Sequence, residues 1–162
     1  MTYIFFILIL NLSVIIVKKI LTEGDLPFIG PPTSIGDIYL GPLYYYMMAI
    51  PMAIFWLNPV AAAGMNALIG VGIVMLIYYL AKIWFGRVPA LISAFLYAIS
   101  PVTINYSRFS WNPNPIPFFS LLAVLFLYLS ATKHKKIFTV LSGVMVGILF
   151  QLHYIDIVFI AI

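Results

Sequence analysis

The sequence contains no cysteine and very few charged residues. Without cysteine, the chain has neither disulfide bonds nor thiolate metal sites. Only 7% of its 162 residues are charged, whereas 65% are hydrophobic, and the mean hydropathy is +1.16. A soluble domain of this length could not bury so much apolar surface. The composition therefore predicts an integral membrane protein.

Several motifs of soluble enzymes are also missing. No HExxH, GxGxxG or Walker pattern occurs, so the sequence does not support a zinc protease, a dinucleotide site or a nucleotide phosphate site. Eight basic side chains outnumber four acidic ones, which gives a formal net charge of +4. We do not take this excess as a sign of nucleic acid binding. The basic residues lie at the ends of apolar runs, where they orient a protein in its membrane.

The apolar residues form separate runs with short polar or proline-containing segments between them, at 1–17, 43–57, 60–81, 88–104, 115–132 and 137–152. A helix of about 20 apolar residues crosses the ~30 Å hydrocarbon layer of a bilayer. We therefore expect an all-α, polytopic membrane helix bundle with about five spans and one juxtamembrane helix. Residues 1–162 would form a single transmembrane domain. We expect it to be a fragment of a longer protein, because the last run, 155–162, has half the length of a span.

Basic residues cluster at two places, Lys82 to Arg87 and Lys133 to Lys136. The positive-inside rule places such clusters in the cytoplasm. Counting spans from either cluster puts the segment 106–115 on the outer side. We therefore expect a multi-pass protein, located in the plasma membrane of a prokaryote.

The run 43–57 differs from the others in length. Fifteen residues make only about 22 Å of helix, and Pro51 interrupts the run. We expect an interfacial helix with its three consecutive tyrosines and Trp56 at the headgroup level. This topology leaves Lys18 and Lys19 outside, against the positive-inside rule. If 43–57 spans the membrane instead, residues 22–42 lie inside and both lysines agree with the rule.

The segment Tyr106-Ser-Arg-Phe-Ser-Trp-Asn-Pro-Asn-Pro115 is unusually polar for its position between two apolar runs. Its prolines prevent a continuous helix. We interpret it as a rigid loop that presents Arg108, Asn112 and Asn114 to a polar ligand, because a guanidinium can hold phosphate oxygens in a planar fork. A simple helix connector, with Arg108 reaching water and Trp111 at the interface, is compatible with the same residues.

Other polar residues are expected on the same outer side. Asp25 and Asp37 are candidate general bases for an acceptor hydroxyl, although aspartates in a segment so rich in turn formers also close turns. His153 is a candidate for binding phosphate or sugar, or has a structural role. Tyr45 is a further candidate for substrate binding. We assign no metal-ligating residue, and a requirement for a divalent metal ion stays open.

A resemblance to a known family rests on four segments, GPPTSIGDIYLGPLYYY (30–46), KIWFGR (82–87), YSRFSWNPNP (106–115) and QLHY (151–154). They resemble the membrane glycosyltransferases of the GT-C fold, in the protein O-mannosyltransferase-like family 39 group. The likeness covers roughly residues 21–154 and corresponds to the N-terminal part of a longer protein. It implies transfer of a sugar from a polyprenyl-phosphate donor to a lipid or protein acceptor at the outer membrane face. The implied partners are therefore a lipid-linked sugar and membrane lipid, without nucleic acid.

The chain departs from this family at the acidic motif that follows the first membrane helix. The corresponding stretch, ILILNLSVIIV, contains no carboxylate. Either Asp25 or Asp37 substitutes for the motif, or the chain is an incomplete or inactive piece of the transferase, which we favour. A transporter or flippase-like bundle and a non-catalytic membrane subunit are the alternative functions. Inverted repeats would favour a transporter, and we find no convincing repeat.

Overall fold

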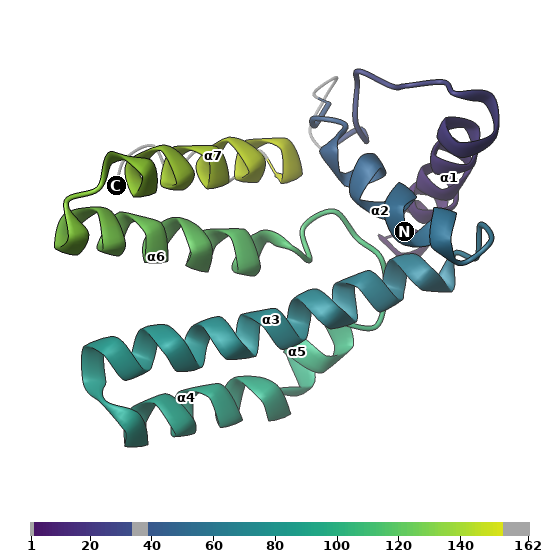
Figure 1. Ribbon diagram of the computed structural model, residues 1–162. Coiled ribbons are helices and arrows are strands. Elements are labelled where there is room, and N and C mark those ends of the chain that lie inside the picture. Colours follow the sequence, from purple (N-terminus) through teal and green to yellow (C-terminus); the bar gives the residue numbers. More distant parts are fainter. Residues whose placement is uncertain (1, 34–38, 154–162) are drawn as a thin grey trace.

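A computed structural model describes residues 2–33 and 39–153 of the chain, and Figure 1 shows their arrangement. Helices account for most of the described residues, and the contacts between Pro32 and Tyr39 form an isolated antiparallel bridge. Within the described ranges, the helices are α1 (Thr2–Glu23), α2 (Leu43–Ile54), α3 (Val60–Phe85), α4 (Arg87–Ile99), α5 (Pro101–Tyr106), α6 (Ile116–Lys133) and α7 (Lys136–Leu152). The all-α helical bundle expected from the sequence is therefore confirmed.

Two helical hairpins form the larger part of the bundle, as Figure 1 shows. Helices α3 and α4 pack against each other, as do α6 and α7. The first helices of the two hairpins lie side by side and run in the same direction. Gly72, near the middle of α3, is close to Phe118, near the beginning of α6. Farther along both helices, the rings of Trp84 and Tyr128 lie 6.0 Å apart.

This parallel arrangement brings the basic clusters to the same end of the bundle. Lys82 and Arg87 flank the turn between α3 and α4, and Lys133 to Lys136 flank the turn between α6 and α7. Both turns use left-handed backbone, with φ of 89° at Gly86 and 52° at His134. Glycine reaches this conformation without a steric cost. We call this region the basic end.

The α6–α7 hairpin is held by polar and aromatic contacts along its length. The Ser142 hydroxyl donates to the Ala123 carbonyl oxygen at 3.0 Å, and the hydroxyls of Ser130 and Thr139 lie 2.6 Å apart. Such hydrogen bonds are common between membrane helices. The spacing of Gly143 and Gly147 predicts a close helix approach, yet both glycines lie open. A methyl group placed on either one would meet no neighbouring atom of the described residues within 4 Å.

The apolar run 88–104 forms two helices, not the single one expected. Ser100 is extended, with ψ of 123°, and α5 begins at Pro101. Proline suits the first turn of a helix because its missing N–H has no helical partner there. The Thr103 hydroxyl donates to the carbonyl oxygens of Tyr97, at 2.7 Å, and Ser100, at 2.9 Å. These bonds satisfy backbone groups at the break.

Helix α2 is short, as the sequence predicts, and contains Pro51. It ends where Trp56 and Leu57 adopt positive φ angles of 53° and 62°. Trp56 is 94% exposed, which suits an interfacial position. The first two tyrosines of α2 do not share that environment, because Tyr44 and Tyr45 are only 2% and 1% exposed. These two rings are therefore covered by protein, and their depth at the headgroup level stays a prediction.

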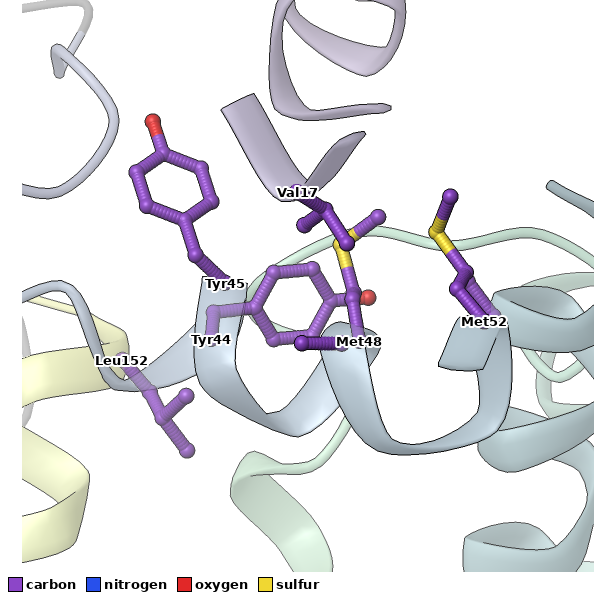
Figure 2. Packing of buried hydrophobic residues seen from close by; sticks show 8 residues of the cluster. Val17, Tyr44, Tyr45, Met48, Met52 and Leu152 are labelled. Atoms are coloured by element: carbon purple, nitrogen blue, oxygen red, sulfur yellow. The ribbon is translucent and has the colours of Figure 1, made fainter. Parts of the chain in front are cut away.

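The main apolar cluster explains this burial. Helix α2 packs against α1, α3 and α7, and Figure 2 shows its side chains in that position. The buried members of α2 are spaced as one face of a helix requires. They contact Val17 of α1, Ala62 of α3 and Leu152 of α7. The cluster includes Tyr44, Tyr45, Met48, Ala49 and Met52.

Helices α3 and α6 are long and apolar enough to cross a membrane, judged by length and composition. Helices α2, α4 and α7 are apolar but shorter. Much of the apolar surface faces outward, for example at Leu68, which is 75% exposed, and Val88, which is 67% exposed. A soluble protein rarely exposes apolar surface of this extent. The fold thus agrees with a helical membrane protein.

Candidate functional site

Opposite the basic end, several segments that are distant in the sequence meet. They are α2, the start of α3, the loop 107–115, the start of α6 and the last turn of α7. We call this region the loop end. It contains the polar loop that the sequence singles out. Its side-chain hydrogen bonds join four of these segments directly, namely α2, α3, the loop and the last turn of α7.

The hydroxyl of Tyr44 is the centre of this hydrogen-bond network. It lies 2.7 Å from the Ser110 hydroxyl and accepts a hydrogen bond from Asn66 Nδ2 at 3.0 Å. The Trp111 backbone also bonds to this hydroxyl. Burial raises the pKa of Tyr44, and these hydrogen bonds only partly oppose that effect. Tyr44 therefore stays neutral and joins α2, α3 and the loop.

The two asparagines of the loop hold its backbone in place. Asn112 is 8% exposed, and its Nδ2 donates to the Leu152 carbonyl oxygen at 2.8 Å. Asn114 Nδ2 donates to the carbonyl oxygens of Tyr106, at 2.7 Å, and Phe109, at 2.8 Å. These amide N–H groups thus have structural partners. Substrate binding by Asn112 or Asn114 stays a prediction.

Arg108 has an exposed side chain on a fixed backbone. The backbone N–H of Arg108 donates to the Asn105 carbonyl oxygen at 3.1 Å. The carbonyl oxygen of the next residue, Phe109, accepts hydrogen bonds from Asn66, at 3.0 Å, and from Asn114. The loop backbone is therefore held by several hydrogen bonds while the Arg108 side chain lies exposed, and presentation of Arg108 to a ligand stays a prediction.

Of the two candidate bases, Asp25 lies among the described residues. Asp25 is exposed and follows α1. The segment that carries it is tied to α2, because the Tyr46 hydroxyl donates to the Pro27 carbonyl oxygen at 2.7 Å. Asp37 lies outside the described residues. A catalytic role for either aspartate stays a prediction.

Tyr45 and His153 lie in different environments. Tyr45 is buried and hydrogen bonded to Ser13 of α1, and burial raises its pKa to about 12. Its side chain therefore belongs to the protein interior. His153 directly follows α7 and is half-buried, and burial lowers its pKa. The neutral imidazole that results can both donate and accept a hydrogen bond.

The last turn of α7 also touches the segment before α2. A methyl group placed on Gly41 would come within 2.6 Å of the Gln151 side chain, so only glycine allows this contact. Together with the bond from Asn112 to Leu152, it keeps the end of α7 beside α2 and the loop. Arg108 and His153 are thus carried by segments that the structure connects. Within the described ranges, no three His, Asp or Glu side chains form a group that could hold a metal ion.

Comparison with known proteins identifies the family. Residues 40–162, more than half of the chain, match the family model described as dolichyl-phosphate-mannose-protein mannosyltransferase. The chain belongs to this family. A relative from Bacillus subtilis (strain 168), named "Putative mannosyltransferase YkcB", is 32% identical over 110 residues. This alignment covers 68% of the chain and 15% of the relative's length. No solved structure matches the chain significantly.

The family match confirms the resemblance to the protein O-mannosyltransferase-like group seen in the sequence. Asn66, in the apolar run 60–81, hydrogen bonds to α2, as a polar residue in a membrane helix is expected to do. The sequence analysis missed Tyr44 and Ser110. The spacing of Tyr44, Met48 and Met52, which places them on one face of a helix, could have indicated that Tyr44 is buried.

Proposed function

We propose that this chain forms part of a membrane glycosyltransferase that takes mannose from a polyprenyl-phosphate donor at the loop end of the bundle. The observation that carries the proposal is the family match over residues 40–162. The position of Arg108 supports it, because an exposed guanidinium on a rigid loop can hold a phosphate. The acceptor is a hydroxyl compound at the same face of the membrane.

In the proposed reaction, the acceptor oxygen forms a bond to C1 of the sugar. The bond between C1 and the phosphate oxygen breaks, and its electron pair leaves with the polyprenyl phosphate. The acceptor proton passes to a carboxylate, for which Asp25 and Asp37 are the candidates. Arg108 stabilises the negative charge that develops on the departing phosphate. The neutral imidazole of His153 can hydrogen bond the same phosphate or the sugar.

The proposal also assigns an orientation. Both basic clusters lie at one end of the bundle, so the positive-inside rule places this end in the cytoplasm and the loop end outside. The chain lacks cysteine, so a single introduced cysteine reports on one position. We expect Asn105→Cys to react with an impermeant maleimide from outside intact cells. Lys135→Cys at the basic end should react only after permeabilisation, and the reverse pattern would refute the orientation.

The test of function is mannose transfer from polyprenyl-phosphate mannose by membranes containing the protein. Removing a single charge-stabilising donor commonly lowers the rate by about 10²- to 10³-fold, so we expect a loss of this size in Arg108→Ala. Arg108→Lys should recover part of the rate, because it keeps the charge without the fork. Arg87→Ala, at the basic end, is the matched control. Unchanged transfer in Arg108→Ala would remove Arg108 from the mechanism.

A further inference from the structure

The basic end of the bundle carries most of the positive charge of the chain. Five of the eight basic side chains lie there, all of them exposed: Lys82, Arg87, Lys133, Lys135 and Lys136. The acidic side chains that the structure describes, Glu23 and Asp25, lie instead near the segment that is hydrogen bonded to α2 at the loop end. Among the described residues, no carboxylate therefore offsets the charge of the basic end.

Lys82 and Lys133 occupy equivalent positions on two helices that contact each other. Each lies in the last turn of its helix, Lys82 on α3 and Lys133 on α6. The rings of Trp84 and Tyr128 lie 6.0 Å apart between these parallel helices. Counted from the two rings at about 1.5 Å per residue, the lysines differ by about 10 Å in position along the helices.

Both ammonium groups can reach a shared ligand. Lysine has a long, flexible side chain, and both residues are exposed. Lys82 Nζ lies 5.8 Å from the centre of the Tyr78 ring. Such a contact is weak at an exposed position, so an anion can compete with it. One anionic headgroup can therefore contact Lys82 and Lys133 together.

Exposed apolar side chains adjoin these two lysines. Phe85 follows Lys82 by three positions and is exposed, and so is Met75, two turns before Lys82 on the same side of α3. On α6, the exposed Leu127 lies next to Tyr128. Cations beside an apolar surface of this kind suit a molecule that has both an anionic end and hydrocarbon chains.

These side chains favour a phospholipid over a soluble anion. Inorganic phosphate would bind the ammonium groups but would leave the apolar neighbours uncovered. A zwitterionic lipid would bring a cation of its own close to the lysines. An anionic phospholipid meets both requirements, and basic sites between membrane helices are known to bind such headgroups. Because lysine presents a point charge and not a planar fork, we expect selection by headgroup charge and not by headgroup shape.

We propose that the ends of α3 and α6 bind one anionic phospholipid, whose headgroup contacts Lys82 and Lys133 and whose acyl chains lie against the apolar side chains beside them. The other cations of the basic end add to the positive potential without contacting this headgroup. A lipid held in this way connects the two helical hairpins where the rings of Trp84 and Tyr128 already join them. The site lies away from the loop end, so it depends neither on the proposed transfer nor on the orientation in the membrane.

The binding test uses Trp84, which is partly exposed and close to Lys82 in the sequence, as a fluorescent reporter. The chain has three tryptophans, so Trp56→Phe combined with Trp111→Phe leaves Trp84 alone. This protein is placed in phosphatidylcholine vesicles that contain a minor share of brominated phosphatidylglycerol or brominated phosphatidylcholine. One lysine near an anionic headgroup raises the affinity about fivefold, so two lysines predict a roughly 25-fold preference for phosphatidylglycerol. Brominated phosphatidylserine, which has the same net charge, should quench equally well.

Charge variants test the location. Lys82→Gln, and Lys133→Gln on the helix that does not carry the reporter, should each lower the affinity for phosphatidylglycerol about fivefold. Lys18→Gln makes the same change at an exposed position of α1 and should leave the affinity unchanged. An unchanged unfolding midpoint shows that each variant is folded. The comparison of the two lipids is made on one protein, so it does not depend on the folding of any charge variant.

Several outcomes would overturn the shared lipid site. They are equal quenching by the two lipids, an effect of only one of Lys82→Gln and Lys133→Gln, and an equal loss in Lys18→Gln, which would assign the preference to net charge. Inorganic phosphate should displace the brominated lipid no better than sodium chloride at the same ionic strength. Stronger displacement by phosphate would identify a soluble anion as the occupant and refute the lipid.

The same measurements separate this inference from the proposed function. If the lipids bind equally but mannose transfer depends on Arg108, the lipid site alone is wrong. If the anionic lipid is preferred as expected and transfer is absent, the site stands and the proposed activity is wrong.

Discussion

The hydroxyl of Tyr44 lies 2.7 Å from the hydroxyl of Ser110, although 66 positions separate the two residues in the chain. This contact joins the short helix α2 to the loop that carries Arg108. Asn66 of α3 donates to the same tyrosine. The Tyr44 side chain therefore positions the loop relative to α2 and α3.

We expect Tyr44→Phe to destabilise the protein by about 1–3 kcal/mol, because it leaves buried donors without their acceptor. The measurement is unfolding by sodium dodecyl sulfate in mixed micelles. Tyr79→Phe, on the half-exposed Tyr79 of α3, is the control and should change little. Equal stability of Tyr44→Phe and the original protein would show that the network contributes nothing.

Asn112→Ala tests the connection between the loop and α7. The Leu152 carbonyl oxygen would lose its bond from Asn112, and we expect a loss of about 1–2 kcal/mol. Hydrogen exchange should also increase selectively near residues 149–152. If exchange instead rises uniformly along the chain, Asn112 supports the whole fold and not this junction.

Gly72 tests the contact between the two hairpins. A methyl group at Gly72 would lie 2.8 Å from Phe118 Cε2, whereas one at Gly64 on the same helix would meet no atom within 4 Å. Overpacking commonly costs about 1–3 kcal/mol, so Gly72→Ala should be destabilised in the detergent titration and Gly64→Ala should not. Adding Phe118→Leu should restore part of the loss. Identical behaviour of the two alanine variants would contradict the parallel packing of α3 and α6.

The stability of the loop end should depend on pH through His153. Burial lowers the pKa of His153 below its ordinary value of about 6.5, so the unfolded state binds this proton more readily than the folded state. The contribution to stability is present above about pH 6.5 and is lost as the pH falls through the lower pKa of the folded protein.

The measurement for His153 compares unfolding midpoints at about pH 7.5 and about pH 5.5, on either side of the ordinary value. His153→Gln should reduce the difference between the two midpoints. His134→Gln, at the exposed turn of the basic end, should leave it unchanged. A difference that persists fully in His153→Gln would assign the pH dependence to another group.

The sequence predicts the helices well where composition decides them. Apolar runs with basic ends indicated most of the long helices within a few residues, since a lipid-facing helix must be apolar throughout. The prediction was less accurate where backbone chemistry decides. The run 88–104 looks continuous, but Pro101 begins a new helix after the extended Ser100.

Contacts between distant residues were harder to predict. The spacing of Gly143 and Gly147 indicated close packing, yet that face is open among the described residues, and the close approaches occur at Gly72 and Gly41. Small residues permit an approach but do not select its partner. Similarly, the sequence analysis proposed Asn112 and Asn114 as candidate substrate-binding groups without indicating that their side-chain N–H groups bind backbone carbonyls. Only the path of the loop determines those partners.

The network around Tyr44 and Asn112 joins amide, hydroxyl and carbonyl groups, all of them uncharged. Mobile ions weaken attraction between charges, but they have little effect on bonds between neutral dipoles. The geometry around Arg108 should therefore persist from dilute buffer to concentrated brine. Ionic strength would then change only how strongly that cation attracts an anion, which makes the two contributions separable in a salt titration.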